Sequence, residues 1–200
     1  EKRTVQRKNP FLNEKNKLVT KKIEGELGLK VEFLEQDQFQ LISDWYHYAI
    51  MMIAETENAD LAPESIADEL GITSLTARYA LERLKRLGLL KEKKGKWVVD
   101  HKYLVTADRS VTTPALRKHQ RQMLEKAILS LEMDAIEKRS ITSVTMAIDP
   151  ERLPKAKAMI EEFNQKLCAF LEGGKRRKVY QLGVSLFPLQ SNDQYSKENI

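Results

Sequence analysis

Two glycines, Gly71 and Gly88, divide the middle of the chain into segments with a helical hydrophobic period. Pro63 suits the first turn of a helix over residues 63–70, where its missing N–H is not needed. Thr73 is suited to cap a second helix, which ends at Gly88. The inward positions are Ile66, Ala67 and Leu70 in the first helix and Ala77, Leu81, Leu84 and Leu87 in the second. The pattern predicts two short helices joined by a tight turn at Gly71.

A hairpin pattern follows these two helices directly. Residues 89–93 and 96–99 flank Lys94-Gly95, a two-residue turn that ends in glycine. Upstream, apolar residues at spacings of three and four predict a further helix from about residue 38 to 55. Those residues are Phe39, Ile42, Tyr46, Ala49 and Ile53. The order helix, helix, helix, hairpin predicts a winged helix-turn-helix domain.

The second helix of the pair would enter the DNA major groove with its outward residues. Arg78 is suited to guanine, Ser74 to a base or a phosphate, and Leu75 to a thymine methyl group. Tyr79 and the lysines are better suited to the DNA backbone. The full set of predicted DNA-binding residues is Ser74, Leu75, Arg78, Tyr79, Arg83, Lys85, Lys93, Lys94 and Lys96. We expect DNA as the partner and a transcriptional regulator as the function.

The charge distribution favours the same partner. The chain has a net charge of +5, but residues 73–97 alone hold eight basic residues and two acids, whereas residues 23–60 have a net charge of −8. A basic segment of this kind suits a phosphate backbone, although a solvated lysine-rich surface has the same composition. The outward face has no Asn or Gln and includes Leu75 and Tyr79. The alternative is therefore a winged-helix scaffold for protein interaction or dimerisation that does not itself bind DNA.

The last third of the chain shows a different pattern. Thr113-Pro114 predicts the start of a long helix that runs to about residue 135. Alternating β-branched residues predict strands at 140–148 and 176–189, on either side of a helix over about 150–171. Two strands form a marginal sheet, so further strands are expected from residues 101–110 or from a second copy of the chain. We expect a homodimer.

These patterns give an α+β fold: a winged helix-turn-helix followed by a long helix and a small β-α-β domain. The expected boundaries are a basic arm or linker at 1–35, the winged helix at 36–106, a regulatory or dimerisation domain at 107–190 and a flexible tail at 191–200. The chain does not begin with Met, so we expect an upstream segment. No apolar run is long enough to span a membrane, and the single Cys168 suggests a structural thiol in a reducing, cytoplasmic setting.

No catalytic or metal-binding pattern occurs in the sequence. His47, His101 and His119 lie far apart, and neither a zinc motif nor a glycine-rich phosphate loop is present. We therefore expect no enzyme activity, no metal and no cofactor. The sequence leaves open whether the protein binds a small-molecule effector. The basic run at residues 175–178 is suited to nucleotide phosphates, although it equally flanks a strand as a solubilising element.

Three stretches resemble the signatures of a bacterial family of predicted transcriptional regulators with a C-terminal domain of unknown function. They are Asp37-x-Phe39-x4-Asp44-Trp45-Tyr46-His47, Ala115-Leu116-Arg117-x-His119-x3-Met123-Leu124 and Tyr180-Gln181-Leu182-x5-Pro188-Leu189. The resemblance covers about residues 35–190. It implies an additional helix-turn-helix of the phage-repressor type upstream, which these 200 residues lack, as the principal DNA reader. The winged helix would then be accessory. It implies no enzymatic activity, ligand or catalytic residue.

Overall fold

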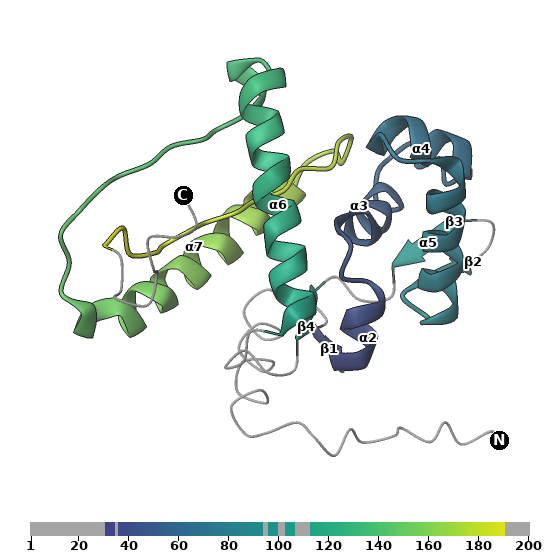
Figure 1. Cartoon of the computed structure of the whole chain (residues 1–200). Helices are drawn as coiled ribbons and strands as arrows, with labels where there is room; N and C mark the ends of the chain where they lie inside the picture. Colours follow the sequence, from purple (N-terminus) through teal and green to yellow (C-terminus); the bar gives the residue numbers. More distant parts are fainter. Residues whose placement is uncertain (1–30, 35, 94–95, 100–102, 107–112, 191–200) are drawn as a thin grey trace, which may run out of the picture.

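The computed structural model describes residues 31–34, 36–93, 96–99, 103–106 and 113–190. These described residues form a helix-rich α+β fold with two small two-stranded sheets. Figure 1 shows a group of short helices on one side, the long helix α6 (Pro114–Met133) in the centre and a second long helix, α7 (Leu153–Glu172), on the other side. The predicted flexible tail at 191–200 lies outside the described residues.

The single helix predicted at 38–55 is in fact two helices, α2 (Gln36–Leu41) and α3 (Trp45–Ile53). The break lies at Asp44, whose extended backbone (φ −71°, ψ 134°) cannot continue a helix, and the Ser43 hydroxyl donates a hydrogen bond back to the carbonyl oxygen of Gln40. Ser and Asp side chains favour such local backbone contacts over helix interiors. The apolar spacing continues across the break because both helices pack on the same core. The prediction of one continuous helix was wrong because this spacing does not reveal the break.

The elements predicted around Gly71 and Gly88 are present. Helix α4 (Pro63–Leu70) is followed by α5 (Ser74–Arg86), then by the antiparallel strands β2 (Leu90–Lys93) and β3 (Lys96–Val99), in which Leu90 lies opposite Val99. The predicted turn at Lys94-Gly95 lies outside the described residues.

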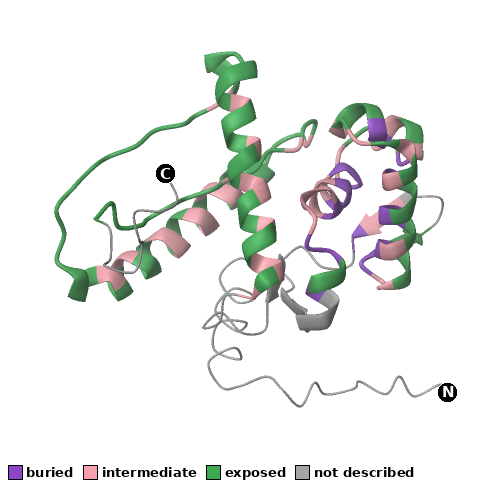
Figure 2. Cartoon of the chain, in the orientation of Figure 1, coloured by how far each residue is buried: buried purple, intermediate pink, exposed green. Residues whose placement is uncertain are grey.

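The buried core lies between α3, α4, α5 and the β2–β3 hairpin. Figure 2 shows buried residues gathered in this part of the chain. The largest fully buried side chains are Ile42, Ile50, Met51, Ile53, Ile66, Leu84, Leu90 and His47. Burying one aliphatic side chain of this size contributes about 1.5–3 kcal/mol, so this cluster is the main source of stability in residues 39–99.

A second small sheet joins the two ends of this region. Strand β1 (Val31–Leu34), which the sequence placed in the basic arm, pairs in parallel with β4 (Tyr103–Thr106), with Val31 opposite Tyr103. The sequence also offered residues 101–110 as a strand for the C-terminal unit, and that expectation was wrong. The partner is instead a segment about 70 residues upstream, a pairing that periodicity within one segment cannot reveal.

The C-terminal part agrees with the sequence in its helices but not in its strands. Helix α6 begins after Thr113, whose hydroxyl accepts a hydrogen bond from the N–H of Leu116, and α7 follows the 3-10 turns η1 (Ile136–Lys138) and η2 (Pro150–Arg152). Within the described part of the chain, no strand is assigned to residues 140–148 or 176–189. The predicted β-α-β unit is therefore absent. Alternation favours an extended backbone, but a strand also needs a neighbour to bond its N–H and C=O groups.

Candidate nucleic-acid interface

A glycine turn fixes how α5 sits relative to α4. Gly71 adopts the left-handed conformation (φ 65°, ψ 40°), which an L side chain rarely adopts, and its N–H donates to the carbonyl oxygen of Ala67. The next helix begins at Thr73, whose hydroxyl accepts a hydrogen bond from the N–H of Thr76 at 3.1 Å. The chain thus turns between α4 and α5 with both helix ends satisfied.

The buried side of α5 determines which residues are left outside. Ala77, Ala80, Leu81 and Leu84 are buried, and the small alanines allow α4 to approach closely. The opposite side consists of the exposed residues Leu75, Arg78, Tyr79, Glu82 and Arg86, spaced at three and four. We call these five residues the outer face of α5. Leu75 and Tyr79 are 58% and 57% exposed although they are large and apolar or aromatic.

The hairpin adds positive charge beside this helix. Lys91 and Lys93 of β2 are exposed, and the Lys85 ammonium lies 4.3 Å from the centre of the Trp97 ring, so α5 contacts β3 through a cation–π interaction. The predicted Lys94 lies outside the described residues. Lys96 belongs to β3, and its side chain also lies outside what is described.

The predicted DNA-contacting residues of α5 differ in their exposure and in the groups that they contact. Arg78 is exposed on the outer face, 3.9 Å from the Glu64 carboxylate of α4. An exposed pair at this distance contributes little to stability and is easily exchanged for another anion. Ser74 is half-buried in the first turn of α5. Leu75 and Tyr79 lie with Arg78 on the outer face, so three of the predicted residues share one surface.

Arg83 does not share this surface. Its Nη1 donates hydrogen bonds to the carbonyl oxygen of Leu41 at 3.2 Å and to Nε2 of His47 at 3.1 Å. The guanidinium group therefore joins α5 to the α2–α3 corner. These bonds do not fit the prediction that Arg83 contacts DNA. If the guanidinium group left the corner to reach DNA, the buried His47 would lose its hydrogen-bond donor.

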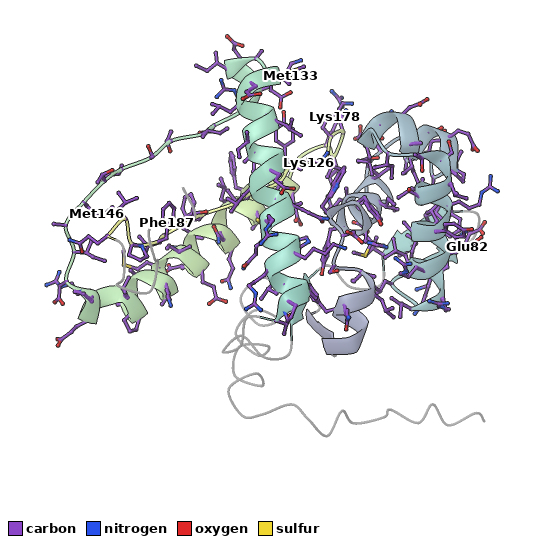
Figure 3. The ribbon with its side chains drawn as sticks, in the orientation of Figure 1. Glu82, Lys126, Met133, Met146, Lys178 and Phe187 are labelled. Atoms are coloured by element: carbon purple, nitrogen blue, oxygen red, sulfur yellow. The ribbon has the colours of Figure 1, made fainter. Side chains whose placement is uncertain are left out.

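Two residues of the outer face were missed from the sequence. Arg86 lies eleven residues after Leu75 and Glu82 seven after it, so both fall on the same side of the helix. Figure 3 shows Glu82 projecting from α5 on the side away from α6. The helical spacing alone could have identified both. Arg86 adds a cation to the face, whereas Glu82 places a carboxylate within it.

A second polar centre joins α6 to the α2–α3 corner. The Asp44 carboxylate lies 2.6 Å from the Lys118 ammonium and accepts a hydrogen bond from Nε2 of Gln122 at 3.0 Å. Gln122 Oε1 in turn accepts from the N–H of Trp45. Although burial raises the pKa of Asp44, the bonds from Lys118 and Gln122 outweigh it, and the pKa lies below its ordinary value.

His119 completes this junction. Its Nδ1 lies 3.1 Å from the carbonyl oxygen of Ser43, and its ring contacts the rings of Phe39 and Tyr48. Two of the three stretches that carry the family resemblance therefore meet here. The motif residues Asp44 and His119 each bind the other stretch, through Lys118 and Gln122 in one direction and the Ser43 carbonyl oxygen in the other, which indicates a structural role for both.

The basic run at residues 175–178 returns to the helical core. Arg176 Nη1 lies 2.6 Å from the Glu55 carboxylate, Arg177 lies 3.5 Å from the Glu57 carboxylate, and the Glu57 N–H donates to the Arg176 carbonyl oxygen. Both guanidinium groups are paired with carboxylates that would repel a phosphate. These contacts give the nucleotide hypothesis no support.

Within the parts of the chain that the structure describes, no group of three or more His, Cys, Asp or Glu residues is placed to hold a metal ion. None of the described helices is long and apolar enough to cross a membrane.

The described elements define a helix-rich α+β protein with a helical core, a β-hairpin beside the last core helix and two long C-terminal helices. A family model, described as Domain of unknown function (DUF4423), matches residues 29–189, and the chain belongs to this family. Neither the curated proteins nor the solved structures gave a match.

Proposed function

We propose that this chain is part of a DNA-binding transcriptional regulator, in which α3, α4, α5 and the β2–β3 hairpin act as a winged helix-turn-helix. The observation that supports this most directly is the outer face of α5. It presents Leu75, Arg78, Tyr79 and Arg86 to solvent beside a basic hairpin, while the other side of the helix is buried. A helix with one face exposed and the opposite face packed on the core can enter the DNA major groove.

The residues divide by the contact they would make. Arg78 on the outer face is suited to the paired acceptors of guanine, and Leu75 to a thymine methyl group. Ser74, in the first turn of α5, is suited to a base or a phosphate, and Tyr79, in the middle of the helix, is suited to the DNA backbone. The cations Lys85, Arg86, Lys93, Lys94 and Lys96 would neutralise phosphates, which fixes position but carries no sequence information.

A second candidate function is protein docking through the same face. Leu75 and Tyr79 are more than half exposed, and Glu82 lies among the cations. A partner protein with an apolar centre, acidic groups opposite Arg78 and Arg86 and a basic group opposite Glu82 would match this surface, whereas Glu82 would repel phosphates.

The deciding experiment measures binding of the 200-residue chain to a random duplex by fluorescence anisotropy across a salt series. We expect affinity to fall steeply with salt, because each neutralised phosphate releases counterions. The variant R78A/R86A should weaken binding at least about tenfold, and each lost phosphate contact should lower the salt slope by about 1.

The matched control is R121A/K157A, which removes two exposed cations from α6 and α7. It should bind as the unaltered chain does. Absence of binding at low salt, or equal losses in both variants, would refute DNA contact by this face. Protein docking would then be the better proposal.

A further inference from the structure

The C-terminal part of the chain leaves its apolar side chains uncovered. No described residue of α6 or α7 is buried. Apart from Leu41, Leu75 and Tyr79, every exposed large hydrophobic residue of the described chain lies between Leu124 and Leu189. They include Ile128, Leu131 and Met133 on α6, Phe163 and Phe170 on α7, and Met146, Val184 and Phe187 outside the helices. Exposed large apolar residues that are concentrated in one region of a chain are typical of an interaction surface.

Two extended segments in this region have the composition of buried strands. Residues 140–148 and 179–189 contain no charged residue, and apolar side chains alternate regularly with small or polar ones over residues 144–148 and 182–186. They are bounded by charges, with Lys138 and Arg139 before the first segment, Asp149 after it and residues 175–178 before the second. Proteins protect strand edges that face solvent with charges, so two uncharged segments indicate strands that are paired in the working molecule.

The first segment and the far end of the second lie away from the helical core, whereas Val179 at the start of the second packs against it. Figure 1 shows the connection after α6 as a wide open arm that reaches the start of α7, and the chain after α7 approaches α4 before it doubles back. Figure 3 places Met146 and Phe187 at the far side of the molecule from α4 and α5. They are 59% and 67% exposed. An open arm of this kind is typical of an element that is exchanged between two copies.

We propose that residues 114–190 form a homodimer interface, in which the uncharged segments 140–148 and 179–189 of one chain pair with those of a second copy. That copy also covers the apolar faces of α6 and α7. No strand of the described chain pairs with either segment, and a second copy would bring the same two segments in a symmetric arrangement. A single two-fold axis would then provide pairing partners for all four segments, two from each chain.

The area available agrees with a stable dimer. A buried aromatic side chain removes about 150–250 Å² from water. Covering Phe163, Phe170, Tyr180 and Phe187, together with a few aliphatic neighbours, would reach the roughly 800 Å² per partner of a specific interface. Each of these four is more than half exposed in the single chain.

The first test needs no substitution. Light scattering after size exclusion should give twice the 23.1 kDa of one chain, with dissociation on dilution. Hydrogen exchange should show protected amides at 140–148 and 179–189 in the dimer, and this protection should disappear as the dimer dissociates. A monomer at every concentration overturns the proposal, and so does protection that is independent of concentration, since the segments would then pair within one chain.

The second test uses charged variants with a matched control. V184K places a charge in an uncharged segment and F163E places one on the apolar face of α7, so each should raise the dimer dissociation constant at least about tenfold. K157E changes charge at an exposed polar position of α7 and should leave it unchanged. Circular dichroism checks folding of the variants. Dimers that tolerate both V184K and F163E would show that the interface lies elsewhere.

Discussion

Arg83 Nη1 donates a hydrogen bond to Nε2 of His47 at 3.1 Å, which ties the middle of α5 to the core helix α3. His47 is fully buried, and its Nδ1 lies 3.1 Å from the carbonyl oxygen of Asp44. A carbonyl oxygen only accepts and a guanidinium only donates, so the ring is neutral with its proton on Nδ1. Through this pair, the position of α5 depends on the α2–α3 corner.

Replacing Arg83 with alanine is expected to lower the free energy of unfolding by about 2–3 kcal/mol, because a buried nitrogen and the Leu41 carbonyl oxygen lose their donor. Urea unfolding followed by circular dichroism measures the change. The matched control is Arg86→Ala, one turn away but exposed, which should change stability by less than about 0.5 kcal/mol. DNA affinity should show the reverse. R86A should lower it, whereas R83A should leave it unchanged as long as the variant folds.

Stability should decrease as the pH falls from about 6.5 toward 4. The pKa of His47 is lowered to about 4, mainly by burial and with a smaller contribution from the nearby Arg83, so the unfolded chain binds the proton first. Stability from this group is fully present above the unfolded pKa of about 6.5 and is lost progressively below it, by about 3 kcal/mol at most. Burial lowers the pKa of His119 as well, which adds a loss of the same sign.

Urea titrations at a series of pH values test this dependence. A His47→Gln variant should start less stable at pH 7 and show a flatter profile between pH 6.5 and 4. A variant profile as steep as that of the unaltered chain would mean that other groups cause the acid loss.

Gln122 is expected to hold α6 against the corner of α2 and α3. Its amide donates to the Asp44 carboxylate and accepts from the first N–H of α3 at Trp45, and Asp44 itself makes no side-chain cap bond there. Gln122→Ala should cost about 1–2 kcal/mol. Gln122→Glu should cost more, because a carboxylate cannot donate to Asp44 and repels it.

Trp45 fluorescence measures this effect, since the Lys126 ammonium of α6 lies 3.7 Å from the centre of its ring; Figure 3 shows the lysine extending from α6. Gln120→Ala, at an exposed position on the same helix, is the control. Equal costs for the alanine and glutamate variants would contradict the donor role of Gln122.

Gly71→Ala is expected to destabilise the chain by about 1–2 kcal/mol through backbone strain alone, because φ is 65° and nothing lies within 4 Å of an added Cβ. Gly71→Asn should cost less, since Asn tolerates the left-handed region. Gly174 has the same open space without a positive φ, so Gly174→Ala should change stability by less than about 0.5 kcal/mol. Thermal unfolding compares the three variants, and similar losses at both glycines would point to a cause other than φ.

Local sequence patterns determined the elements whose signals lie within a few residues. The caps at Thr73 and Thr113, the turn at Gly71 and the hairpin strands around residues 94–95 were all predictable, because each depends on a side chain and the backbone next to it. The helical period likewise indicated the outer face of α5 at Leu75, Arg78 and Tyr79.

Tertiary structure decided what depends on distant partners. The sequence assigns Arg83 to an amphipathic helix, but only folding brings it to His47, 36 residues away. The parallel pairing of β1 with β4 and the contact of Asp44 with Gln122 also join segments far apart in the chain. Alternation in residues 140–148 and 179–189 determined an extended backbone but could not supply a neighbouring strand. Hydrogen bonds between strands form only where the fold, or a second chain, places another backbone alongside.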